Sequence, residues 1–186
     1  AAVAESYNTG VASEATRLHS NFEATEIGLL ADDAPKGLTV DLGCATGRVG
    51  NLLARSNNVT SYVGFDISAH MIAEANSRNE HDKCSFEQAD LEEGIPLSEE
   101  SASFVVASLG TASDFYDLEK LLDEISRILV RGGLFFLSFY NKNGILYRQP
   151  FVPYETGLDA VVDVDQNCLS VHFEDKVYRI HARPYD

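Results

Sequence analysis

The 186-residue sequence has little positive charge, with 14 lysines and arginines against 29 aspartates and glutamates and a formal net charge of -15. A surface of this sign repels a phosphate backbone, so nucleic acid is disfavoured as a substrate or partner. The alternative explanation of the charge is that it only keeps the protein soluble.

Long apolar runs, paired cysteines and metal-binding histidine patterns are absent too. No run approaches the roughly 20 apolar residues of a membrane span, and residues 1–10, with Glu5, do not resemble a signal peptide. Cys44, Cys84 and Cys168 form no CxxC pair, which is typical of free thiols in a reducing compartment. The five histidines lack metal-ligand spacing. We therefore expect a cytoplasmic protein without a membrane partner or a metal site.

The sequence does contain a regular alternation of strand and helix patterns. Short apolar runs alternate with segments whose apolar residues recur at helical spacing, and Ser68 and Asp117 are candidate N-caps. This pattern predicts an α/β fold with a doubly wound, mostly parallel sheet and helices on both faces. The expected strands are 38–42, 62–66, 84–90, 103–110 and 134–140, and the expected helices are 14–30, 48–55, 69–79 and 117–131, the last ended by Gly132 or Gly133.

The stretch "TVDLGCATGRVG", residues 39–50, joins the first strand to a helix through a glycine turn. Gly43 and Gly47 leave the backbone bare, and the N-terminus of the following helix offers unpaired N–H groups. A side chain at Gly43 would stand where backbone and ligand meet. The turn therefore predicts a site for a nucleotide-like ligand.

Acidic residues recur where the expected strands end, and in a parallel sheet these ends meet at one edge. Asp66 follows the turn by about twenty residues, the spacing at which a carboxylate can accept both hydroxyls of a ribose. Its alternative role is that of a turn residue or a charge at a helix N-terminus. Asp90 could accept from an exocyclic amine, and the backbone of Leu91 could address a ring nitrogen. Ile67 and Met71 could cover an adenine, although Met71 suits the core equally well.

These segments resemble the successive motifs of the class I S-adenosylmethionine-dependent methyltransferases. The resemblance covers roughly residues 38–140 and implies a Rossmann-like methyltransferase fold with S-adenosylmethionine as cofactor. It rests on "VDLGCATG", "YVGFDIS", "FEQADLEEGIPL", "SFVVASLG" and "ILVRGGLFFLSF", which occur in the family's order and spacing.

The resemblance also implies a role for each cofactor-binding position. The turn passes the methionine moiety, with Asp41 near its amino group, and Ser108 lies near the sulfonium. Asp66 binds the ribose, the residue after it flanks the adenine, and Asp90 meets the adenine amine. The full cofactor-binding set is Asp41, Gly43, Cys44, Ala45, Gly47, Asp66, Ile67, Met71, Asp90, Leu91 and Ser108.

The implied reaction is methyl transfer to a small-molecule acceptor by in-line displacement, with the protein mainly aligning the two reactants. The sequence departs from the family's pattern at two places. Ala45 stands where many members have glycine, a mild change because the residue is still small. The segment "LGTASDF", residues 109–115, lacks the histidines that many relatives carry there, so no general base and no catalytic residue is identified.

Two other functions stay open. One is a non-catalytic module that binds a nucleoside cofactor or serves as an interaction subunit, because a fold does not fix an activity. The other is an NAD(P)-dependent reductase, since residues 43–50 give GxxxGxxG and Tyr116 and Lys120 give YxxxK. Asp41 and the displaced last glycine fit that fingerprint poorly.

Residues 141–186 have a different sequence pattern from residues 1–140. We expect residues 1–140 to form the cofactor-binding methyltransferase core. The short alternating segments of residues 141–186 predict an antiparallel meander in the same domain, a lid over the acceptor site. The strand at 134–140 would then keep an open edge, because the family's final helix and strands are lacking. We expect a homodimer or a missing C-terminal segment to cover this edge. The alternative is that the meander folds back and completes the sheet.

Overall fold

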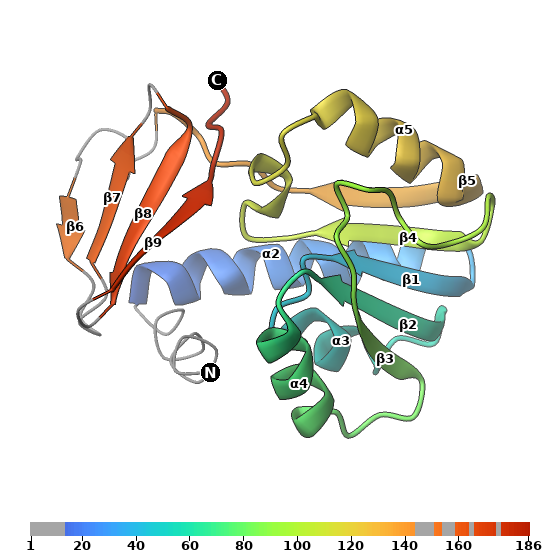
Figure 1. Ribbon diagram of the computed structural model, residues 1–186. Helices are drawn as coiled ribbons and strands as arrows, with labels where there is room; N and C mark the ends of the chain where they lie inside the picture. Colours follow the sequence, from blue (N-terminus) through green and yellow to red (C-terminus); the bar gives the residue numbers. More distant parts are fainter. Residues whose placement is uncertain (1–13, 144–150, 154–158, 164–165, 174–175) are drawn as a thin grey trace.

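The computed structural model describes residues 14–143, 151–153, 159–163, 166–173 and 176–186 (Figure 1). Strands and helices alternate through residues 14–137, and the regular elements among the described residues beyond 150 are strands. The elements are α2 (Glu14–Asp33), β1 (Gly37–Leu42), α3 (Arg48–Leu53), β2 (Val59–Asp66), α4 (Ala69–Arg78), β3 (Cys84–Gln88), β4 (Ala102–Ala107), the 3-10 helix η1 (Thr111–Ser113), α5 (Leu118–Ile128), β5 (Leu129–Leu137), β6 (Phe151–Pro153), β7 (Asp159–Asp163), β8 (Cys168–Phe173) and β9 (Lys176–His181).

The first five strands form one sheet in the order β3-β2-β1-β4-β5, and every neighbouring pair is parallel. This confirms the predicted doubly wound α/β fold. The inner strand β4, between β1 and β5, is buried along its whole length, which explains its unbroken apolar run from Phe104 to Ala107.

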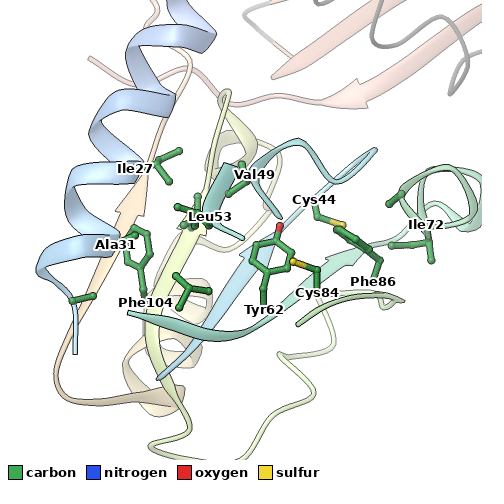
Figure 2. Packing of buried hydrophobic residues seen from close by; sticks show 14 residues of the cluster. Ile27, Ala31, Cys44, Val49, Leu53, Tyr62, Ile72, Cys84, Phe86 and Phe104 are labelled. Atoms are coloured by element: carbon green, nitrogen blue, oxygen red, sulfur yellow. The ribbon is translucent and has the colours of Figure 1, made fainter. Parts of the chain in front are cut away.

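Helices cover both faces of the parallel sheet. On one face, apolar residues of α2, α3 and α4 pack against Tyr62 and Phe104, and Figure 2 shows Ile27 and Ala31 of α2 in this cluster. On the other face, a second cluster contains the buried residues of α5. The sheet is therefore closed to solvent on both sides, and only its edges and strand ends can hold a site.

Two helix starts follow the predicted caps, but one helix end does not. The side chain of Ser68 accepts the Met71 N–H at 3.4 Å, and that of Asp117 accepts the Lys120 N–H at 3.1 Å. The prediction that Gly132 or Gly133 ends α5 is wrong. Helix α5 stops at Ile128, and β5 starts at once and then bulges, because Ala102 pairs with Leu129 but Phe104 pairs with Leu134. Both glycines lie in this bulge.

The last four strands form a separate antiparallel sheet in the order β6-β7-β8-β9, as the predicted meander requires. Within the described ranges it does not pair with β5, so the alternative in which it completes the parallel sheet is wrong. Figure 1 shows it beyond the edge where the parallel strands end. It is attached there by the Arg183 N–H, which donates to the Ser113 carbonyl at 2.9 Å, and by His181, whose ring stacks on Tyr116 at 4.2 Å.

No helix within the described ranges has both the length and the apolar character needed to cross a bilayer.

Substitutions of Gly28 and Gly132 test the conformational preference of the backbone without a change in packing. A Cβ at either position would have nothing within 4 Å. Gly28 is helical, whereas Gly132 has a φ of +79°. We expect Gly28→Ala to raise the free energy of unfolding by about 0.5–1 kcal/mol, and Gly132→Ala to lower it by about 1–2 kcal/mol. Urea denaturation measures both. A neutral Gly132→Ala would contradict the bulge conformation.

Candidate functional site

The glycine turn between β1 and α3 is tied to the end of β2 through its backbone. The N–H groups of Gly43 and Cys44 both donate to the carbonyl of Phe65, at 2.8 and 2.9 Å. The Ala45 N–H donates to Oδ2 of Asp66 at 2.9 Å. The structure therefore joins the predicted turn directly to the predicted ribose-binding carboxylate.

Three residues of this turn have left-handed backbone conformations. Gly43 and Gly47 have φ values of +72° and +81°, which glycine adopts without strain. Ala45 has a φ of +46°, so the position where many relatives carry glycine does require a glycine-like conformation. The change to alanine is thus less mild than its size suggests, because a Cβ costs about 1–2 kcal/mol in this region.

The expectation that a side chain at Gly43 would meet a ligand needs correction. A Cβ at Gly43 would lie 2.5 Å from Cγ2 of Thr111. Thr111 belongs to the loop after β4, so Gly43 allows two loops to pack together. The space beside this glycine is filled by the protein itself.

Asp41 lies under the turn and is 1% exposed. Its Oδ2 accepts the Tyr62 hydroxyl at 2.5 Å, and its Oδ1 is buried without a hydrogen-bond partner. Burial raises the pKa of this carboxyl to about 7, against the lowering effects of the Tyr62 bond and the Arg48 charge. A buried acceptor without a partner beside bare backbone fits a ligand that brings an N–H donor or a positive charge.

Asp66 is half-buried at the end of β2. Besides Ala45, it accepts the Ser68 N–H through Oδ1 at 2.8 Å. Burial raises the pKa of Asp66, and these two bonds oppose the rise. Each carboxylate oxygen has a second lone pair, so the side chain can hold the turn and still accept from a ligand.

The other positions in the predicted set surround this centre to different degrees. Ile67 is 65% exposed and Met71 is half-buried, so both side chains border the solvent beside Asp66. Asp90 is exposed, and its Oδ1 accepts the Glu92 N–H at 3.0 Å. Leu91 is half-buried and packs against the α5 side of the core.

Cys44 and Ser108 offer a ligand less than the sequence indicates. The Cys44 side chain is buried in the core, where a Cβ at Gly64 would lie 2.7 Å from its Cβ, and burial raises the pKa of its thiol. Only its backbone can therefore face a ligand. The Ser108 carbonyl is taken by the Thr111 hydroxyl at 2.7 Å, inside the loop that touches Gly43. No group of three or more His, Cys, Asp or Glu in the described ranges could hold a metal ion.

The family described as Methyltransferase domain matches residues 40–137, more than half of the chain. The chain belongs to the class I S-adenosylmethionine-dependent methyltransferases. The cofactor of this methyltransferase family is S-adenosylmethionine.

Solved structures share the fold of this methyltransferase at low sequence identity. An S-adenosylmethionine-dependent methyltransferase from Clostridium acetobutylicum has a TM-score of 0.68 at 16% identity, over 88% of this chain and 73% of its own. The PH0226 protein of Pyrococcus horikoshii has a TM-score of 0.67 at 23% identity, over 94% and 78%.

A chain of the Haloferax volcanii complex that contains the Trm112 methyltransferase activator has a TM-score of 0.59 at 25% identity. The match covers 72% of this chain but only 57% of the Haloferax chain, so this chain spans little more than half of that relative's length. No curated protein matches.

Three residues that shape this site are not predicted by the sequence pattern: Tyr62, Thr111 and Glu23. Glu23 of α2 is 2% exposed, and its Oε2 accepts the Leu109 N–H at 2.7 Å, so it anchors the loop after β4. The sequence held a signal for it, because Glu23 stands one turn before the buried Ile27, on the apolar stripe of its helix. Nothing comparable marks Tyr62 or Thr111, whose partners lie far away in the sequence.

The first prediction about the site concerns the buried carboxyl of Asp41. With a pKa of about 7 it keeps its proton in the folded protein between about pH 4 and 7, where the unfolded chain has lost it, so the free energy of unfolding falls as the pH rises through this window. Asp41→Asn has no such proton, and its amide oxygen can still accept from Tyr62. We expect the free energy of unfolding of Asp41→Asn to exceed that of the parent protein by about 2–4 kcal/mol at pH 8. At pH 4 the two values should differ little.

Urea denaturation at the two pH values measures this difference. Asp123→Asn is the matched control, because Asp123 is exposed and the change removes the same charge. An equal gain in both variants at pH 8 would show general relief of the negative charge and contradict the assignment to Asp41. Asp114, whose pKa burial also raises to about 7, should account for pH dependence that persists in Asp41→Asn.

The second prediction concerns the contact between Gly43 and Thr111. We expect Gly43→Ala to lower the free energy of unfolding by about 2–4 kcal/mol, from the positive φ and the clash together. Thr111→Ser removes the clashing methyl and keeps the hydroxyl that bonds Ser108. The double variant should therefore recover the steric part of the loss and keep the conformational part. A double variant no better than the sum of the single changes would contradict the contact.

Proposed function

We propose that the protein transfers a methyl group from S-adenosylmethionine to a small-molecule acceptor by in-line displacement. The observation that carries the proposal is the 2.9 Å bond between Asp66 and the Ala45 N–H of the glycine turn. It holds a carboxylate suited to ribose hydroxyls beside bare backbone suited to the rest of the cofactor. Membership of the methyltransferase family, matched over residues 40–137, supports this assignment.

The residues present fit this cofactor. The unpartnered Oδ1 of Asp41 suits the amino group of the methionine moiety, with Gly43, Cys44, Ala45 and Gly47 giving backbone around it. Asp66 would accept from the ribose, and Ile67 and Met71 would flank the adenine. Asp90 and Leu91 would meet the adenine edge, and Ser108 would lie near the sulfonium.

S-adenosylmethionine supplies a methyl group on a sulfonium, so the protein needs mainly to align the acceptor behind that group. A cavity of about 370 Å³ at the end of β5 has the size of a small-molecule site. It is lined by Leu118, Phe139, Tyr140, Asn141, Tyr185 and Asp186. We propose that the acceptor enters between this cavity and residues 108–113, with the antiparallel sheet as a lid in the same domain.

A reductase is disfavoured by the surroundings of its YxxxK pair. Tyr116 is 71% exposed and stacks on His181, and the amino group of Lys120 donates to the Glu92 carbonyl. Neither side chain lies at the glycine turn. We also propose a cytoplasmic location, which the free cysteines suit.

The third prediction tests the cofactor assignment through the ribose. Asp66 also anchors the turn, so loss of affinity on substitution would not by itself identify a ribose contact. We therefore compare S-adenosylhomocysteine with its 2′-deoxy analogue by calorimetry. Removing the hydroxyl should cost the parent protein about 1.5–3 kcal/mol of binding free energy and should cost Asp66→Asn much less.

If the parent and Asp66→Asn lose equal binding free energy on removal of the hydroxyl, Asp66 does not contact the ribose. The control is Asp123→Asn, at an exposed position, which should behave like the parent. Binding of NADPH instead of S-adenosylhomocysteine would overturn the cofactor itself. Binding of S-adenosylhomocysteine without methylation of any compound in a metabolite panel would favour the non-catalytic module.

A further inference from the structure

A buried carboxylate links the first described helix to the loop after β4. Glu23 of α2 is 2% exposed, and its Oε2 accepts the Leu109 N–H at 2.7 Å. Leu109 has a φ of +56°, an uncommon conformation for leucine, which this bond helps to hold. The side chain of Glu23 is therefore fixed at the carboxyl end of β4.

The second oxygen of Glu23 faces a histidine. Nε2 of His19 lies 2.9 Å from Oε1 of Glu23, one turn away on the same helix, at ion-pair distance but without the alignment of a hydrogen bond. The His19 side chain is 59% exposed, so most of its ring borders the solvent. A histidine that is paired with a buried carboxylate and otherwise exposed is the arrangement of a general base with its orienting partner.

This pair stands close to the proposed point of methyl transfer. Leu109 follows Ser108, whose carbonyl accepts the Thr111 hydroxyl at 2.7 Å, and Thr111 packs on Gly43 of the turn. Figure 1 shows α2 extending past the edge of the parallel sheet toward the antiparallel sheet. His19 thus lies one turn further than Glu23 along α2 toward the antiparallel sheet, which is the proposed lid of the acceptor site.

We propose that His19 is the general base for the acceptor and that Glu23 is its positioning residue. The inference rests on the proposed methyl transfer and narrows its acceptor to compounds with an ionisable O–H, N–H or S–H group. A lone pair of the acceptor forms the new bond to the methyl carbon while the carbon–sulfur bond breaks, its electrons passing to sulfur to leave S-adenosylhomocysteine. The acceptor's proton passes to Nδ1 of His19, the Glu23 carboxylate stabilises the imidazolium, and water then takes the proton.

If Glu23 only tied α2 to the loop after β4, the bond from the Leu109 N–H to Oε2 would be sufficient. The second oxygen would then be better satisfied by a buried donor than by an exposed imidazole, because a buried acceptor without a well-aligned partner is costly. A purely structural role therefore gives no reason for Oε1 of Glu23 to face His19.

The fourth prediction is tested first on the protein alone, by nitrogen NMR of the histidine side chains. We expect neutral His19 to carry its proton on Nε2, facing Glu23, and to leave Nδ1 free. Glu23→Gln keeps an oxygen for Leu109 but turns an amide toward the ring, so it should shift the proton to Nδ1. A His19 ring protonated on Nδ1 in the parent, or unchanged in Glu23→Gln, would overturn the proposal.

The kinetic test offers a panel of small phenols, alcohols, amines, thiols and carboxylates with S-adenosylmethionine labelled in its methyl group. For any O–H, N–H or S–H compound methylated, His19→Gln should lower kcat by about 100-fold or more. Glu23→Gln should lower kcat without changing the affinity for S-adenosylhomocysteine. His81→Gln is the matched control, because His81 precedes β3 at the opposite edge of the sheet, and it should keep the parent's rate.

Full activity of His19→Gln, or methylation of carboxylates alone, would overturn the assignment and leave the proposed function intact. If the protein binds S-adenosylhomocysteine but methylates nothing in the panel, small-molecule transfer fails, and the base assignment falls with it whatever the NMR result.

Discussion

The site depends on the hydrogen bonds by which the end of β2 holds the glycine turn. The Phe65 carbonyl and the Asp66 carboxylate take three successive N–H groups, those of Gly43, Cys44 and Ala45. Buried N–H groups without partners would be costly, so this closure fixes one conformation of the turn, left-handed residues included. The same bonds set Asp66 in place. The turn and the carboxylate are thus organised together before any ligand arrives, which lowers the conformational-entropy cost of binding.

The buried carboxyl of Asp41 works against the stability of the free protein. Its Tyr62 bond satisfies one oxygen, whereas the other has no hydrogen-bond partner, and a pKa near 7 means that ionisation is opposed at neutral pH. An asparagine would fill the same space without an ionisation cost. Such local conflicts concentrate at functional sites, and this one lies where our proposal sets a positively charged amino group. A ligand of that charge would favour the ionised carboxylate and offset its desolvation.

The sequence predicts best those features whose causes are local. A few neighbouring residues are enough to show the strand and helix periods, the Ser68 and Asp117 caps and the acids at the strand ends. The parallel sheet follows from the alternation of strands and helices. The α5 end was missed because a glycine pair suits a helix stop and a bulge equally, and pairing with β4 decides between them. The packing of Thr111 on Gly43 arises from tertiary contact alone. No local pattern could have shown it.

Helix α2 shows why the contacts around the loop after β4 could not be predicted from the sequence. Its apolar stripe packs on one face of the sheet through Ile27 and Ala31, and this packing sets the rotation of the whole helix. Once that rotation is fixed, Glu23 points at the sheet, and the Leu109 N–H at the end of β4 donates to it. His19, one turn earlier, is carried to the same place by helical geometry. The core packing of α2 therefore determines both how the loop after β4 is held and where His19 lies.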